Sequence, residues 1–182
     1  MNAAFERSAQ TREVLRFRYP RWKELPMLEL YMDQMTGYIA GIFAPLMDGE
    51  DGDRPLTKAM VNNYVKAHLI PPPDKKKYRR EHVACLIIYC AMKQVLSLPE
   101  ARSILQMAQE ENTLPRIYDF LCQEIENALA EAWNQPYERK EDCTVSGESR
   151  ELLVRFARSC ANKIYLQKRI SFEEGRFRVP TK

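Results

Sequence analysis

The chain has 182 residues, of which 45% are hydrophobic and 29% charged, and its net charge is +3. This length suits one sizeable core or a small domain with an extension, and six glycines against eight methionines favour helices over a β-sandwich or barrel. No apolar run is long enough for a membrane helix, and the charged N-terminal stretch lacks the apolar core of a secretory signal, so we expect a cytoplasmic protein.

The cysteines do not follow a metal or disulfide pattern. There are five of them, none in a C-x-x-C pair, so neither a zinc site nor a disulfide framework is indicated. We interpret them, Cys143 included, as free thiols. Four should behave as small core residues on helices: Cys85, Cys90, Cys122 and Cys160.

Charge is distributed unevenly along the chain. Residues 54–80 contain eight basic residues and one acidic residue, whereas residues 100–142 contain four basic and ten acidic residues. A basic segment attached to an acidic body indicates that one region binds a polyanion.

The first 55 residues are predicted to form an arm, a helix and a loop. Residues 1–24 mix charged and aromatic side chains, and residues 28–47 have apolar side chains spaced three and four apart, which predicts a helix. Glycine, aspartate and proline in residues 48–55 predict a loop. We expect the arm to be partly ordered by packing of its aromatic residues, which are Phe17, Tyr19 and Trp22.

The central segment should contain a short helix, a proline turn and a buried helix. Thr57 can cap a helix that ends near His68, because its hydroxyl can accept a hydrogen bond from a free amide of the first turn. Three consecutive prolines at positions 71–73 then prevent any helix. Residues 81–96 are apolar on nearly every side, which is typical of a buried central helix.

Capping signals predict the next two helices. Ser97 and Glu100 form an S-x-x-E capping box at the start of one helix, which should end near residue 111. Thr113 should cap the next helix, over residues 115–134. A polar loop follows, and the chain after the last helix should be loose.

The last predicted helix, over residues 149–171, has an incomplete heptad pattern. Such a seam suits self-association in a homodimer, and it suits packing on the preceding helix of the same chain equally well. The residues of the seam are Leu152, Leu153, Phe156, Cys160, Ile164 and Gln167.

Helical periodicity gives the helix over residues 57–68 a polar outer face. If its apolar side chains pack inward, two adjacent asparagines and a lysine lie on the opposite side. The asparagine amide can pair with N6 and N7 of adenine, and lysine can reach guanine or a phosphate. The candidate base-contacting residues are Lys58, Asn62, Asn63 and Lys66.

A basic run follows the prolines and should contact phosphates beside that helix. Tyr78 lies inside the run, and its ring is expected to anchor the turn to the core. A simpler alternative holds that both the asparagine face and the lysine turn are solvated surface without a ligand. The candidate phosphate-binding residues are Lys75, Lys76, Lys77, Arg79 and Arg80.

The order of these parts resembles the DNA-binding domain of MerR-type regulators. That pattern has a recognition helix, a "GLI-P" step, a basic wing ending in Tyr-Arg, a buried helix and an "sL-x-x-I" helix start. The chain has "VNNYV", "HLIPP", "KKYRR", "HVACLIIYCAMKQV" and "LSLPEARSIL" in the same order. The segments "LELYMDQMTGYI", "LTKAMVNNYVK", "KKYRREHVACLIIY" and "MKQVLSLPEA" are still more similar to a bacterial YkrK-like family of unknown function, itself described as MerR-like. The resemblance covers roughly residues 25–133.

The chain departs from the MerR pattern in its recognition helix. That family has Arg and Tyr where Asn62 and Asn63 stand, and its step glycine is replaced by His68. The loop before Thr57 is also longer. The base-contacting residues therefore come from the helical wheel alone, whereas the wing follows from both arguments. The resemblance also implies dimerisation through helices after the wing.

No motif indicates an enzyme. The two histidines, His68 and His82, accompany no recognisable nucleophile, and we expect a structural role for His82. The sequence contains no glycine-rich phosphate loop and no metal-binding motif. We therefore predict no catalytic activity, cofactor or metal.

The sequence thus predicts an all-α protein with a MerR-like winged helix-turn-helix and a helical C-terminal extension. The predicted parts are an arm (1–24), the DNA-binding domain (25–110) and the extension (111–182). The predicted function is sequence-specific binding of double-stranded DNA in transcriptional regulation. The alternative is a helical protein-interaction module whose basic turn binds an acidic partner.

Overall fold

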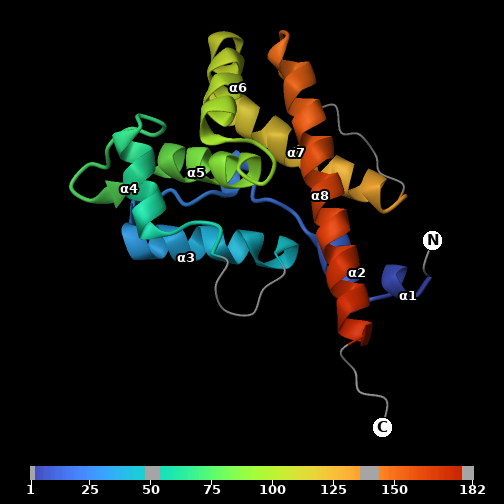
Figure 1. Cartoon of the computed structure of the whole chain (residues 1–182). Coiled ribbons are helices and arrows are strands. Elements are labelled where there is room, and N and C mark those ends of the chain that lie inside the picture. Colours follow the sequence, from blue (N-terminus) through green and yellow to red (C-terminus); the bar gives the residue numbers. More distant parts are fainter. Residues whose placement is uncertain (1–2, 48–53, 136–143, 178–182) are drawn as a thin grey trace.

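The computed structural model describes residues 3–47, 54–135 and 144–177 (Figure 1). This part of the chain contains eight α-helices, two short 3-10 helices and one two-stranded antiparallel sheet, so the all-α prediction is confirmed. The elements are α1 (Ala3–Glu6), α2 (Ala9–Arg16), η1 (Trp22–Glu24), β1 (Leu30–Tyr31), α3 (Met32–Phe43), η2 (Ala44–Leu46), α4 (Lys58–Lys66), β2 (Lys77–Tyr78), α5 (Arg80–Met92), α6 (Leu98–Glu111), α7 (Leu114–Ala132) and α8 (Ser149–Phe177).

Helix α5 is the centre of the fold, as its apolar sequence predicted. Every residue from His82 to Met92 is buried. Figure 1 shows α5 crossing the middle of the molecule, with α3 below it, α6 above it and the long α8 to one side. Because α5 is covered on all sides, its side chains contribute to one hydrophobic core shared with the helices around it. The predicted division into 1–24, 25–110 and 111–182 stays a prediction.

The N-terminal arm is held against α7 by polar contacts as well as by its aromatic side chains. Arg21 forms a bidentate pair with Glu126, with Nη2 lying 2.6 Å from Oε2. The backbone N–H of Trp22 donates to Asp119 at 2.6 Å. The ring of Tyr19 is buried, with its centroid 4.6 Å from that of Phe17. The expected packing of the arm is confirmed, and α7 provides the surface.

The helix predicted over residues 28–47 begins later than expected. Leu30 and Tyr31 form β1, which pairs with β2 in the register Leu30 to Tyr78 and Tyr31 to Lys77. Helix α3 therefore starts at Met32. Apolar spacing alone did not reveal this strand, because its partner lies far along the chain and a strand of two residues is defined only by that pairing.

The capping predictions for α6 and α7 have different outcomes. Ser97 and Glu100 form the expected capping box of α6, in which the Ser97 N–H donates to the Glu100 carboxylate at 2.7 Å. Thr113 occupies the N-cap position of α7, but its hydroxyl makes no capping hydrogen bond. Pro115 lies in the first turn of α7 and has no N–H to satisfy, which reduces the need for a cap.

Helix α8 extends to Phe177, beyond the predicted end at residue 171. Its apolar seam packs on α7 within the same chain, although Gln167 is exposed. Packing within the chain therefore accounts for most of the seam. Residues 48–53, 136–143 and 178–182 lie outside the described residues, and they include most of two predicted loops, Cys143 and the last five residues of the tail that was predicted to be loose. The first half of that tail belongs to α8, so the prediction of a loose tail is wrong there.

The remaining cysteines are free and buried, as predicted: Cys85, Cys90, Cys122 and Cys160. In the described segments, none of the helices has the length and apolar character needed to cross a lipid bilayer.

Candidate nucleic-acid interface

Helix α4 is fixed to the protein by its N-cap and by two buried side chains. The Thr57 hydroxyl accepts a hydrogen bond from the Met60 N–H at 3.2 Å, which confirms the predicted cap. Val61 and Tyr64 are buried, and the ring centroid of Tyr64 lies 5.9 Å from that of Tyr89 in α5. The inner face of α4 is thereby committed to the core.

The outer face of α4 is polar and exposed, in agreement with the helical wheel. The exposed side chains are those of Lys58, Ala59, Asn62, Asn63 and Lys66. None of these residues contributes to the hydrophobic core. The amides of the two asparagines are therefore presented to solvent, where a ligand can reach them.

Helix α4 ends in a Schellman motif at His68. The His68 N–H donates to the Val65 carbonyl at 3.1 Å, and the Leu69 N–H donates to the Tyr64 carbonyl at 2.9 Å. His68 has φ 54°, in the left-handed region that favours glycine. Helix α4 ends at Lys66, slightly before the predicted end near His68, because the left-handed conformation of His68 reverses the chain and exposes the imidazole.

The basic run forms a tight turn before β2. The Lys77 N–H donates to the Asp74 carbonyl at 2.7 Å, and the two central residues have positive φ, 46° for Lys75 and 65° for Lys76. Positive φ at both central positions is the arrangement of a type I′ turn, which asparagine and glycine normally occupy. Both lysine side chains are exposed at the apex.

The turn is anchored by Tyr78, as predicted. The Tyr78 side chain is buried, and its ring packs edge to face against the His82 ring, with the two ring centroids 5.6 Å apart. The His82 Nδ1 accepts a hydrogen bond from the Arg79 N–H at 3.0 Å, and burial lowers the pKa of this imidazole. His82 therefore caps α5 in its neutral form, which is the structural role expected of it.

Three of the nine candidate residues are partly engaged within the chain. Lys58 forms an ion pair with Asp33 of α3. The Lys77 Nζ lies 3.9 Å from a carboxylate oxygen of Glu29, and the Arg80 guanidinium lies 5.8 Å from the ring centroid of Trp22.

Both carboxylates belong to the segment around β1, which sequence reasoning did not connect with the basic residues. Pairing of β1 with β2, and packing of α3 on α4, bring them together. The other six candidate residues are exposed: Asn62, Asn63, Lys66, Lys75, Lys76 and Arg79.

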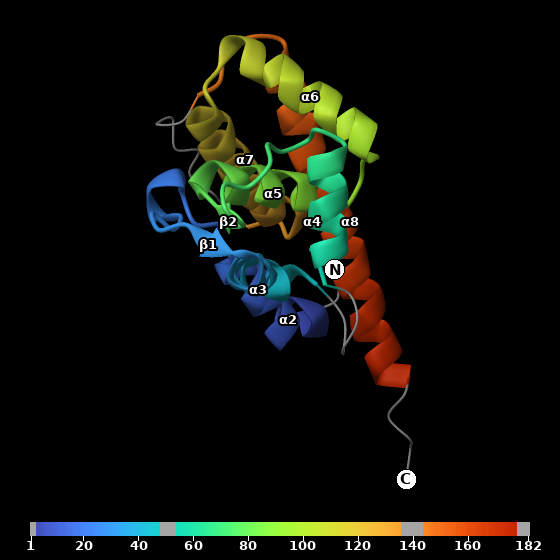
Figure 2. The ribbon, with the colours of Figure 1, turned by 90° about the vertical axis from the view of Figure 1, so that its left-hand side faces the viewer.

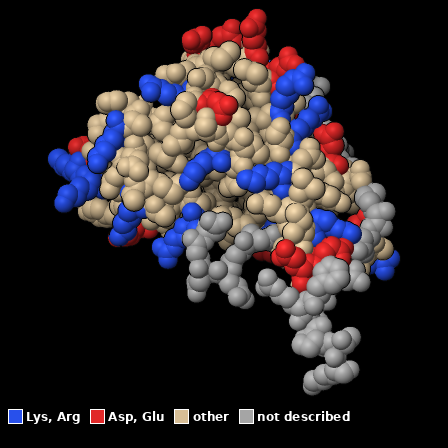
Figure 3. All heavy atoms as spheres, in the orientation of Figure 1, with Lys and Arg blue, Asp and Glu red and all other residues tan. Residues whose placement is uncertain are grey.

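The exposed polar face of α4 and the basic turn lie on one side of the molecule. Figure 2 shows α4 and β2 on the side toward the viewer, with α5 behind them. In Figure 3 lysine and arginine side chains gather at the left edge, where α4 and this turn lie, and acidic side chains gather at the top, near the end of α6. The tertiary structure thus keeps the charge separation that the sequence indicated.

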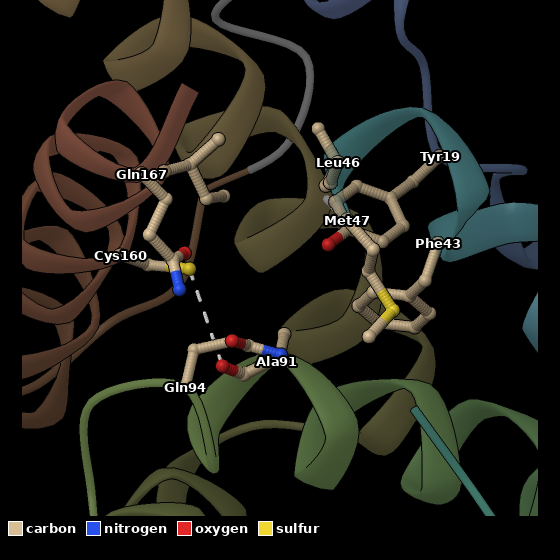
Figure 4. Close-up of a pocket in the computed structure, with 9 residues that line it drawn as sticks. Tyr19, Phe43, Leu46, Met47, Ala91, Gln94, Cys160 and Gln167 are labelled. Carbon is tan, nitrogen blue, oxygen red and sulfur yellow. Dashed lines mark hydrogen bonds between the residues drawn. The ribbon is translucent and has the colours of Figure 1, made fainter. Parts of the chain in front are cut away.

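A small cavity lies away from this face, between η2, α5 and α8 (Figure 4). It measures about 60 Å³, and the Cys160 thiol at its wall donates to the Ala91 carbonyl at 4.0 Å. Burial raises the pKa of Cys160 to about 12, so the thiol is neutral and a poor nucleophile. Among the described residues, no group of three or more His, Cys, Asp or Glu side chains is arranged to hold a metal ion.

Comparison with known proteins assigns a family to the chain. A family model described as "Domain of unknown function (DUF1836)" matches residues 20–139. No curated protein and no solved structure matches the chain. The matched region contains α3 to α7 and the whole basic turn, and it is more than half of the chain. The expected membership of a family of unknown function is therefore confirmed at this level: the chain belongs to the DUF1836 family.

Proposed function

We propose that the protein is a sequence-specific, double-stranded DNA-binding transcriptional regulator. In this proposal α4 is the recognition helix, the turn before β2 is a basic wing, and no residue has a catalytic role. The observation that carries the proposal is the exposed polar face of α4 on the same side of the molecule as the basic turn (Figure 2). A helix that reads base edges, with cations beside it for the phosphates, is the arrangement of a winged helix-turn-helix.

The chemistry of α4 supports base reading. Asn62 and Asn63 each present an amide that can both donate and accept, which matches N7 and N6 of adenine in the major groove. Lys66 follows one turn later at the end of the helix and is exposed. Thr57 and the buried Tyr64 hold the backbone, so that the outer side chains start from a fixed position.

The backbone of the basic turn supports a role in phosphate binding. Lys75 and Lys76 both adopt positive φ, which is unfavourable for residues with a Cβ atom. Glycine or asparagine would relieve this strain but would remove a cation from the apex. The turn therefore presents two exposed positive charges at its apex, where they can contact a phosphate.

Two local features support a MerR-like winged helix over residues 25–110. The MerR pattern has a glycine where the chain has His68, and the backbone there adopts the left-handed conformation that glycine favours. The wing of that pattern ends in Tyr-Arg, and here Tyr78 is buried and anchors the turn. The departure at His68 thus changes the side chain and keeps the backbone conformation.

The proposal includes a homodimer formed through the C-terminal extension, residues 111–182. Most of the predicted seam of α8 packs on α7, so the dimer needs another surface. Leu166 and Ile170 are separated by one helical turn, and they are 58% and 57% exposed. If this face joins two copies about a two-fold axis, the recognition helices should contact half-sites roughly 34 Å apart.

Selection of bound duplexes from a random double-stranded DNA pool tests the proposal. We expect enrichment of a defined motif, with two half-sites if the dimer forms. Binding of all sequences alike would refute the proposal and leave the alternative, a basic turn that recognises an acidic partner protein. Salt dependence does not separate the two, because both contacts are electrostatic.

A further inference from the structure

Two aliphatic side chains next to the sheet are almost fully exposed. Met27 and Leu28 are 86% and 82% exposed, and Tyr31 is 55% exposed. Met27 and Leu28 precede β1, and Tyr31 belongs to β1, the strand that pairs with β2. Leu25, just before them, is buried, and Leu30, just after them, packs against the core. The two exposed residues thus lie between two anchored positions, and their side chains project from the surface.

One cation, Lys77, lies at the residues that follow the two exposed side chains. Tyr31 is the register partner of Lys77, whose Nζ lies 5.9 Å from the centroid of the Tyr31 ring. A carboxylate oxygen of Glu29 lies 3.9 Å from the same Lys77 Nζ, so the ammonium offsets the negative charge of Glu29. The strand that carries Lys77 continues the basic turn on the face shared with α4 (Figure 2). An apolar projection next to a strand that pairs with the end of the basic turn fits an anionic partner that also offers an apolar surface.

We propose that Met27 and Leu28 form an apolar wedge that enters the minor groove of the bound duplex, beside the major-groove segment read by α4. This inference rests on the proposed function. Protruding aliphatic side chains can enter the minor groove and partly unstack a base step, which bends the duplex. The position of the wedge, just before β1, which pairs with the strand that follows the basic turn, favours DNA over a membrane or a second protein, because the proposed phosphate contacts lie in that turn.

The wedge differs from the lysines in its dependence on salt. Each lysine that binds a phosphate releases a counterion, so its loss reduces the slope of log affinity against log salt by about 0.9. An apolar wedge releases no counterion, and its loss should lower affinity at every salt concentration without changing the slope. It should also leave the duplex less bent, because the unstacked step closes again.

The test compares Met27→Ser/Leu28→Ser with Leu15→Ser/Met107→Ser. The control removes two other exposed apolar side chains, 36% and 39% exposed, from α2 and α6. Binding of the selected duplex is measured at several salt concentrations, and bending is measured by energy transfer between dyes at the duplex ends. Unfolding in urea confirms that both variants are folded. Vesicles of anionic phospholipid serve as a second ligand.

We expect the wedge variant to bind the duplex roughly tenfold or more weakly, with an unchanged salt slope and a smaller bend, while the control behaves like wild type. Equal affinity and bending in wild type and wedge variant would overturn the inference, as would an equal loss in the control. Binding of vesicles by wild type but not by the wedge variant, with duplex binding unaltered, would assign the wedge to membranes and overturn it too. Failure of the wild-type protein to select any motif would instead refute the proposed function.

Discussion

Helix α4 precedes the basic turn in the chain and α5 follows it, and the two helices have opposite roles. Eleven of the 13 residues of α5 are buried, against two of the nine residues of α4. The two helices meet at Tyr64 and Tyr89, so both belong to the same packed region. The fold uses nearly every side chain of α5, whereas it leaves one face of α4 without a structural task. Changes in α5 should therefore alter stability, and changes on α4 should alter binding.

Truncation of a core side chain in α5 should have the largest effect. Leu86 is fully buried, so Leu86→Ala removes apolar contacts and leaves a cavity. We expect a loss of about 2–5 kcal/mol in the free energy of unfolding, measured by urea denaturation. A loss below that of an exposed substitution such as Ala59→Ser would contradict the central position of α5.

Truncation of the asparagines should change DNA discrimination and leave stability almost unaltered. For Asn62→Ala and Asn63→Ala we expect losses of about 1–3 kcal/mol in preference for the selected motif, because each change removes the proposed bidentate contact to adenine. Alanine has a high helix propensity, so the free energy of unfolding should not fall. The measurement is competition between the selected duplex and a mutated one.

Lys76→Ala is the matched variant for the asparagine changes, since it should weaken all duplexes alike. If the asparagine variants kept the wild-type motif preference, α4 would not be the reading helix.

A single substitution that relieves the backbone strain of the basic turn should stabilise the protein and weaken its binding to DNA. Lys76→Gly removes the Cβ atom from a residue with φ 65°, and we expect the free energy of unfolding to rise by about 0.5–1 kcal/mol. The same change removes one cation, so the salt slope of DNA binding should fall by about 0.9. Denaturation and salt titration of the same sample provide both values. A stabilised variant with an unchanged slope would show that Lys76 does not contact phosphate.

Removal of a carboxylate beside the interface should strengthen binding slightly. Asp33 holds Lys58 in an exposed ion pair, so Asp33→Asn frees a cation and removes a negative charge from the proposed DNA-binding side. We expect tighter binding of all duplexes by up to about 1 kcal/mol, most visible at low salt. Lys58→Ala in the Asp33→Asn background should cancel part of the gain. An unchanged affinity in the single variant would place Lys58 outside the interface.

The smallest effect should come from His82, at the start of α5. Burial lowers the pKa of His82 below its ordinary value of 6.5, so the unfolded state binds this proton more readily. The contribution of His82 to stability is therefore complete above about pH 6.5 and declines as the pH falls towards the folded pKa. His82→Gln can still accept the hydrogen bond of Arg79 but does not titrate. We expect urea denaturation between pH 7.5 and 5.5 to show a weaker pH dependence for this variant.

The candidate site was predictable where the signals are local. Thr57 caps α4 through an amide three residues away, and the periodicity of α4 placed Asn62 and Asn63 outside. The Schellman ending at His68 was missed, since glycine is its usual marker and a histidine gives no such signal. The carboxylates of Glu29 and Asp33 were missed because only tertiary packing brings them to Lys77 and Lys58.

The sequence by itself determined the helical class, the buried α5 and the start of most helices, because hydrophobic periodicity and capping act within a few residues. Only the tertiary structure decided that residues 30 and 31 form a strand with β2, that Arg21 and Glu126 join the arm to α7, and that α8 packs on α7. Each of these contacts joins residues far apart in the chain. No local pattern encodes which distant partner will be reached, and the choice depends on how all the apolar faces are buried together.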